Sequence, residues 1–259
     1  MSASHRRATT NHIAVLAFPF GTHAGPLLTL VRRLSEAAPH LRFSFLSTAR
    51  SNASIFSGGS TRPNPNIRPY DVGDGLPEGY VFGGNQVEVV ELFLNGAAER
   101  FKKGMEAAAA AAGEEIGCVM SDAFFWFAGD MAGAMKVPWV ALWTSGPRPL
   151  FLHLETDLIR ENLKSSGSRE KSLDFLPGLG FSSMRVADLP EEVASGSADS
   201  PFADMVHKMG HHLPRATSVL INSFQEIDTE MHHLLNSRLQ NFLNIGPLNI
   251  LSPPPPTSE

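Results

Sequence analysis

The sequence predicts an α/β fold in which helices cover a parallel sheet. Short apolar runs rich in β-branched and aromatic residues alternate along the chain with longer segments of helical period. This alternation is typical of parallel strands joined by helices. The chain has 259 residues, of which 42% are hydrophobic, so it is long enough to bury a sizeable core.

The strands and helices can be placed in order along the chain. The predicted strands are residues 13–18, 43–46, 67–72, 117–121, 139–143, 218–222 and a short one at 242–245. The predicted helices are residues 26–37, 87–112, 126–135, 149–163, 202–212 and 224–239. The first strand is short, and neither its length nor its flanks fit a secretory signal. Segments 51–66 and 165–183 are predicted loops because of their glycine, proline and serine content.

Two helix ends carry recognisable signals. Gly113 follows a run of alanines and is expected to end that helix as a C-cap. Ser223 and Glu226 have the spacing of a capping box, which predicts the start of the helix at 224–239.

The composition excludes several classes of protein. With a net charge of −5, the chain has no overall field that would attract nucleic acid or anionic lipid. No stretch is long and apolar enough to predict a membrane span. The single cysteine, Cys118, excludes a disulfide framework and a cysteine-based zinc site. We therefore expect a soluble protein of a reducing compartment, the cytoplasm.

In open α/β sheets, ligands bind outside the carboxyl ends of the strands. The loop after the first strand contains Gly21, Thr22 and His23 and leads into a helix, which Thr22 could cap. A histidine at this place could hold its ring in the cleft, or it could simply be a polar residue at a helix start. The segment contains neither a dinucleotide-binding nor a P-loop glycine motif.

Asp122 follows the fourth predicted strand. An aspartate there could orient His23 and stabilise its protonated form, although a lone aspartate at such a position is more often a helix N-cap. The sequence has no G-x-S-x-G elbow, and Cys118 lies inside a predicted buried strand, so a hydrolase triad is disfavoured. A histidine base that deprotonates a substrate hydroxyl fits these residues better.

Other histidines raise the question of a metal site. His207 and His211 are four residues apart on a predicted helix, and two adjacent pairs, His211–His212 and His232–His233, occur. Without a third ligand at a recognisable spacing, we interpret them as residues of solvent-exposed helix faces. The aromatic residues at 124–127 are expected to belong mainly to the core, with one or two lining a pocket.

Six motifs, in order along almost the whole chain, resemble a known family. They are HIAVLAFPFGTHAGPL at 12–27, DGLPEGY at 74–80, SDAFFW at 121–126, WTSGP at 143–147, VLINSF at 219–224 and NIGPL at 244–248. Together they resemble the N-terminal half of plant family-1 UDP-sugar glycosyltransferases, particularly flavonoid and anthocyanidin 3-O-glucosyltransferases. The resemblance implies a GT-B enzyme with two Rossmann-like lobes, of which this chain is the N-terminal, acceptor-binding lobe.

The resemblance also implies roles for individual residues. His23 matches the general base and Asp122 its aspartate partner, in an inverting transfer of glucose from UDP-glucose to a flavonoid or anthocyanidin hydroxyl. UDP-glucose is then a co-substrate, and neither a metal nor another cofactor is expected. Thr22 and Thr144 match contacts to the donor.

The acceptor pocket implied by the resemblance is aromatic. Phe124, His153 and Phe202 fall where flavonoid-type enzymes line it. A glutamine contact to the acceptor is expected near Gln86, although an ungapped alignment puts Val87 at that place. Because of this one-residue offset, the assignment of Gln86 as an acceptor contact is left open.

The resemblance divides the chain into a lobe at 1–248 and the start of a proline-rich interdomain linker at 249–259. The donor-binding lobe is expected to follow that linker and is absent from the chain. We therefore expect little or no turnover by these residues alone. The alternative is a catalytically inactive polyphenol-binding module; an unrelated esterase or dehydrogenase is disfavoured by the missing motifs.

Overall fold

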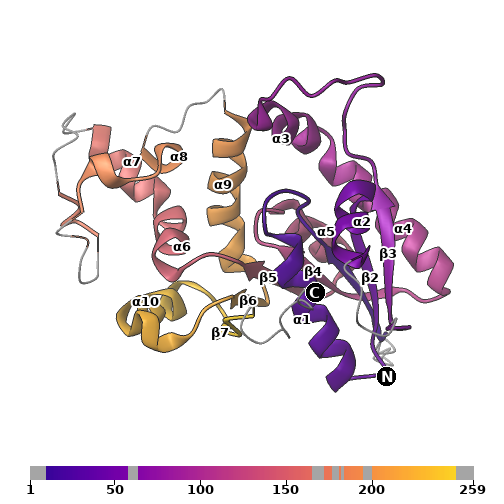
Figure 1. Cartoon of the computed structure of the whole chain (residues 1–259). Helices are drawn as coiled ribbons and strands as arrows, with labels where there is room; N and C mark the ends of the chain where they lie inside the picture. The colour runs from indigo at the N-terminus through magenta and orange to yellow at the C-terminus, as the bar shows by residue number, and fades with distance from the viewer. Residues whose placement is uncertain are drawn as a thin grey trace, which may run out of the picture.

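A computed structural model describes residues 10–57, 64–164, 172–176, 181, 184–194 and 200–248 of the chain. Its centre is a seven-stranded sheet in the order β3-β2-β1-β4-β5-β6-β7, and every neighbouring pair is parallel. The strands are β1 (His12–Leu16), β2 (Arg42–Thr48), β3 (Ile67–Val72), β4 (Ile116–Asp122), β5 (Trp139–Trp143), β6 (Ser218–Ile221) and β7 (Phe242–Asn244). The predicted fold class is therefore confirmed (Figure 1).

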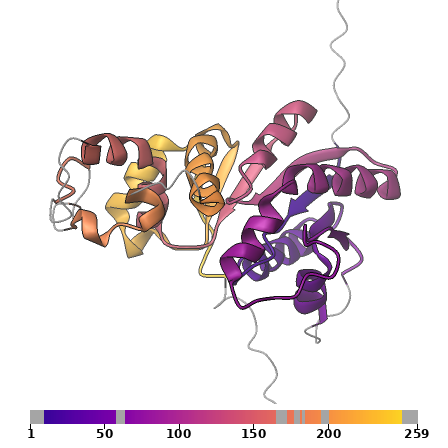
Figure 2. The same cartoon turned by 90° about the horizontal axis from the view of Figure 1, so that it is seen from above.

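Helices connect the strands and lie on both faces of the sheet, as the view from above shows (Figure 2). They are α1 (Ala24–Ala37), α2 (Ala49–Ser57), α3 (Gln86–Leu94), α4 (Ala97–Ala112), α5 (Phe127–Met135), α6 (Pro147–Leu154), α7 (Thr156–Lys164), α8 (Glu191–Ala194), α9 (Pro201–His212) and α10 (Thr229–Arg238). In the described ranges, no helix combines the length and the apolar composition that crossing a bilayer requires.

Two apolar cores flank the sheet because side chains of a strand point alternately to its two faces. In and just after β1, Val15 and Ala17 join a core with α1, whereas Leu16 and Phe18 join a larger core on the other face. The larger core also contains Phe101 of α4. The chain therefore needs near-continuous apolar strands, which explains why the strands were recognisable in the sequence.

Several predicted elements differ from the structure. The predicted helix at 87–112 is two helices, α3 and α4, because Gly96 adopts a left-handed conformation with φ 73° between them. The predicted helix at 149–163 is likewise divided into α6 and α7 at Glu155. The predicted loop at 51–66 begins as helix α2, whose polar sequence gives a weak helical pattern.

The predicted helix caps have different outcomes. Gly113 ends α4 in a left-handed conformation, and its N–H bonds to the carbonyls of Ala109 and Ala110, which confirms the predicted C-cap. The capping box of Ser223 and Glu226 is wrong: a short 3₁₀ turn follows β6, and Asp228 caps α10 instead.

Thr22 does not cap α1 either, because His23 occupies the N-cap position without a side-chain bond to the helix. Most of the predicted loop at 165–183 and the predicted linker at 249–259 lie outside the described residues.

Candidate active site

The candidate site forms where β1 and β4 lie side by side at the centre of the sheet. After β1 the sheet is extended on one side by β2 and β3, and after β4 it is extended on the other side by β5, β6 and β7. A crevice at the carboxyl ends of strands is expected at such a reversal of strand order. His23 lies in the connection after β1, and Asp122 is the last residue of β4.

His23 and Asp122 are in direct contact. The Nδ1 atom of His23 lies 2.8 Å from Oδ2 of Asp122, and the histidine side chain is 20% exposed whereas the aspartate is 1% exposed. The second carboxylate oxygen, Oδ1, accepts the backbone N–H of Phe124 at 3.0 Å. Both oxygens of the buried carboxylate are therefore bonded, which fixes its orientation.

The arrangement assigns the two ring nitrogens of His23 different functions. If Nδ1 carries the proton that it donates to Asp122, Nε2 is left with a lone pair. Among the described residues, no hydrogen-bond partner of Nε2 is found. The hydroxyl of Thr144, which follows β5, lies 3.5 Å from Nδ1. An oriented, partly exposed imidazole of this kind can accept a proton from a bound molecule.

Aromatic rings surround the histidine. The Phe124 ring is 4.6 Å from the His23 ring, and the Phe18 ring is 5.2 Å from it, measured between centroids. Phe202, near the start of α9, meets Phe124 edge to face at 6.0 Å. The wall can therefore contact a flat aromatic molecule beside the histidine.

His153 of α6 joins this wall through Trp143, whose ring lies 5.7 Å away. Its side chain is buried, and its Nδ1 atom has no hydrogen-bond partner within the part of the chain that the structure describes. Burial lowers the pKa of His153 to about 4, so this histidine is neutral near neutral pH.

The structure thus brings together most, but not all, of the predicted site residues. His23, Asp122, Phe124 and Thr144 form one cluster, and Phe202 and His153 reach it through Phe124 and Trp143. Thr22 is exposed beside His23, and Gln86 is exposed at the start of α3. Within the part of the chain that the structure describes, no hydrogen bond, ion pair or ring contact joins either of these two to the cluster.

Phe18 and Trp143 were missed as site residues. Both lie at or just after the carboxyl end of a central strand, and both belong to the core that also contains Phe125. Their positions at strand ends were a usable signal, but an apolar ring there was indistinguishable from an ordinary core residue.

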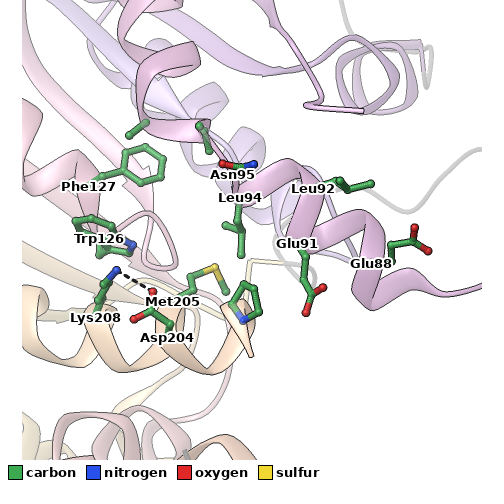
Figure 3. Close-up of a pocket in the computed structure, with 14 residues that line it drawn as sticks. Glu88, Glu91, Leu92, Leu94, Asn95, Trp126, Phe127, Asp204, Met205 and Lys208 are labelled. Atoms are coloured by element: carbon green, nitrogen blue, oxygen red, sulfur yellow. Dashed lines mark ion pairs between the residues drawn. The ribbon is translucent and has the colours of Figure 1, made fainter. Parts of the chain in front are cut away.

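A separate pocket of about 650 Å³ opens between α3 and α9 (Figure 3). Trp126 lies on one side, and Lys208 places its Nζ atom 4.9 Å from the Trp126 ring centroid. Lys208 also forms an ion pair with Asp204 at 2.7 Å. None of the predicted site residues lines this pocket, so it is distinct from the cluster around His23.

The chain is similar in sequence to known plant proteins. The chain is 49% identical over 253 residues to anthocyanidin 3-O-glucosyltransferase of Vitis vinifera, covering 96% of the chain and 55% of the relative. It is 52% identical over 249 residues to an anthocyanidin 3-O-galactosyltransferase of Actinidia chinensis, covering 94% of the chain and 53% of the relative. No protein-family profile matches the chain.

The fold agrees with a solved structure as well. A crystal structure of an anthocyanidin 3-O-glucosyltransferase in complex with UDP is 35% identical with a TM-score of 0.85, over 95% of this chain and 54% of that one. The fold is therefore that of the N-terminal lobe of GT-B glycosyltransferases. The chain spans about half the length of the relatives it matches.

Proposed function

We propose that this chain, whose curated relatives are flavonoid and anthocyanidin 3-O-glycosyltransferases, is the acceptor-binding half of an enzyme that transfers a sugar from a UDP-sugar to a flavonoid hydroxyl. Glucose is the proposed sugar and the 3-hydroxyl the proposed acceptor group, although both glucosyl- and galactosyltransferases occur among the relatives. The observation that carries the proposal is the His23–Asp122 contact of 2.8 Å beside an aromatic wall.

In the proposed reaction, His23 acts as the general base. Nε2 takes the proton of the acceptor hydroxyl while the hydroxyl oxygen forms a bond to the anomeric carbon of the sugar. The bond from that carbon to the phosphate oxygen breaks, and UDP leaves from the opposite face, so the anomeric configuration inverts. Asp122 stabilises the imidazolium that forms. No metal takes part in this scheme.

The remaining residues are proposed to position the two substrates. Phe124, Phe202 and the neutral His153 give the acceptor an aromatic surface, because flat rings gain from offset and edge-to-face contact. Gln86 is proposed as a further acceptor contact. Thr22 and Thr144 are proposed to contact the phosphate and sugar hydroxyls of the donor.

The two halves of the proposed enzyme have different tasks. Holding both substrates in a reactive alignment lowers the activation barrier by about 7–11 kcal/mol at best. We propose that residues 1–259 alone turn over little or no substrate, since the donor would lack much of its binding surface. Incubation of the 259-residue chain with UDP-glucose and a flavonol tests this, and efficient product formation would contradict it.

The base is tested in a form that also carries the second lobe. His23→Ala should abolish most glucosylation while flavonol binding, followed by fluorescence quenching, persists. If the 259-residue chain binds a flavonol and the two-lobed wild type makes no glycoside from any UDP-sugar, the chain is a polyphenol-binding module instead. Near-wild-type turnover by His23→Ala would show that another group is the base.

A further inference from the structure

A second cluster of polar side chains lies away from His23, between α7 and α9. Nε2 of His207 is 2.7 Å from Oδ1 of Asp157, and Nε2 of His211 is 2.8 Å from Oδ2 of the same carboxylate. The two Nε2 atoms are themselves 3.2 Å apart. The sequence lacked a third ligand at a recognisable spacing for this histidine pair, and the structure provides one from another helix.

The contacts bring together four potential ligand atoms, the two Nε2 atoms and the two oxygens of one carboxylate. If each Nε2 carries a proton, each N–H donates to its own oxygen, and the two nitrogens lie 3.2 Å apart without a hydrogen bond between them. If one Nε2 is unprotonated, its lone pair faces a carboxylate oxygen at less than 3 Å, which is repulsive. A cation held between the two nitrogens and the carboxylate would be attracted to that lone pair and to the carboxylate alike.

The donor set and spacing suit a particular class of cation. Two imidazole nitrogens and a carboxylate are ligands that zinc and its neighbours in the transition series accept. With bonds of about 2.0–2.1 Å and tetrahedral angles, two ligand nitrogens stand about 3.3 Å apart. The 3.2 Å separation of the two Nε2 atoms is close to that value. The nitrogen–oxygen separations of 2.7 and 2.8 Å are hydrogen-bond distances, so the carboxylate would move outward when an ion binds.

We propose that Asp157, His207 and His211 bind a divalent transition-metal ion of the zinc type, with water as the fourth ligand. The ion would enter from solvent, because the side chains of Asp157 and His211 are 62% and 54% exposed. His207 is 28% exposed and forms the inner side of the site.

The surrounding structure holds the ligands in place. His207 and His211 are one turn apart on the same face of α9. Helix α7 is fixed to α8 through Arg160, whose guanidinium donates to the backbone carbonyls of Glu192 and Val193.

A bound ion would join α7 to α9. Helix α9 also carries Phe202, which packs against Phe124 beside His23. The proposal does not depend on the proposed glycosyl transfer, because it concerns binding of the ion by this chain alone. A bound ion would hold α7 and α9 together at the place where Asp157 contacts His207 and His211.

The test is calorimetric titration of the metal-free 259-residue chain with zinc chloride. We expect one zinc ion per chain for the wild type. His211→Ala and Asp157→Asn should each weaken binding by at least the roughly 10–100-fold that loss of an outer-shell partner costs. Circular dichroism of each variant checks that it is folded.

Matched controls are available on the same surface and elsewhere. His233→Ala removes an exposed histidine of α10, and Asp204→Asn removes an acid from α9; both should bind zinc as the wild type does. No heat with the wild type at millimolar zinc would overturn the proposal. Equal binding by the folded His211→Ala and Asp157→Asn variants would overturn it as well.

Discussion

His23 and Asp122 are 99 residues apart in the chain, yet Nδ1 of the histidine lies 2.8 Å from a carboxylate oxygen of the aspartate. The adjacency of β1 and β4 causes this, because Leu16 pairs with Ser121 and both site residues follow closely. The contact is therefore a product of the strand order rather than of local sequence.

The charge of Asp122 is the first feature to test in the two-lobed enzyme. Asp122→Asn keeps an oxygen for the Phe124 N–H but removes the negative charge beside His23. We expect activity to fall roughly 10²–10⁴-fold, the usual contribution of acid–base catalysis, with little loss of stability. Steady-state kinetics of the variant and of Asp122→Glu measure this; unchanged turnover of the asparagine variant would contradict the proposed pairing.

Gly210 marks a close approach between α9 and α6. A Cβ atom at this position would overlap the carbonyl oxygen of His153. Gly210→Ala should therefore lower the free energy of unfolding by about 1–3 kcal/mol. Gly133 of α5 has open space, so Gly133→Ala is the matched control and should stabilise by about 0.5–1 kcal/mol. Urea unfolding of both variants separates crowding from helix propensity.

The corrected helix cap gives a direct comparison. Asp228 caps α10 and forms an ion pair with Arg148 at 2.7 Å. Asp228→Ala should cost about 0.5–2 kcal/mol of stability, and Asp228→Asn should recover most of it because asparagine also caps. Glu226→Ala should change stability by less than about 0.5 kcal/mol. If Glu226→Ala lowers the stability in thermal unfolding more than Asp228→Ala does, Ser223 and Glu226 would form the cap after all.

His153 makes stability depend on pH. Burial lowers its pKa from 6.5 to about 4, so the unfolded chain binds a proton at a higher pH than the folded one. Above pH 6.5 the histidine is neutral in both states and does not affect the free energy of unfolding. That free energy falls as the pH drops from about 6.5 to about 4. The full loss is on the order of 3 kcal/mol.

His153→Leu should remove that part of the pH dependence. Denaturant unfolding at several pH values between 4 and 7 measures the difference between the variant and the wild type. A difference that stays constant across this range would mean that His153 does not titrate on unfolding.

Cys118 reports on the integrity of β4. Burial raises the pKa of its thiol from 9.0 to about 11, which lowers the thiolate fraction about a hundredfold. A thiol reagent at pH 8 should react slowly with the folded chain and fast in urea. Since the chain has one cysteine, one equivalent marks complete reaction, and Cys118→Ser provides the blank.

Sequence patterns predicted the sheet better than the helices. The segment that became β5 had the predicted boundaries because an apolar strand buried on both faces has a continuous pattern. Strand β3 also had the predicted boundaries, although it is a mostly exposed edge strand. The break between α3 and α4 depends on the backbone conformation of Gly96, which its identity alone does not specify. Helix α2 is stabilised by packing of Ile55 and Phe56 on one core, and its polar residues concealed it.

The candidate site was predictable where strand order alone determines proximity. His23, Asp122 and Thr144 each lie at or after the carboxyl end of a central strand, so an expected parallel sheet already placed them at one edge. The partner of His207 and His211 could not be predicted in this way, because Asp157 is on a different helix. Helix packing depends on side-chain fit along their whole length.

The adjacency of β1 and β4 also has a consequence for how the chain folds. Strand β1 can pair with β2 soon after both are synthesised. Its other edge pairs with β4, which is synthesised about a hundred residues later. Closing a loop of this length costs roughly 4 kcal/mol of chain entropy. Until then β1 presents unpaired backbone groups, which favour association between chains. A nascent chain is therefore most vulnerable to aggregation before β4 leaves the ribosome, and His23 and Asp122 can meet only after that step.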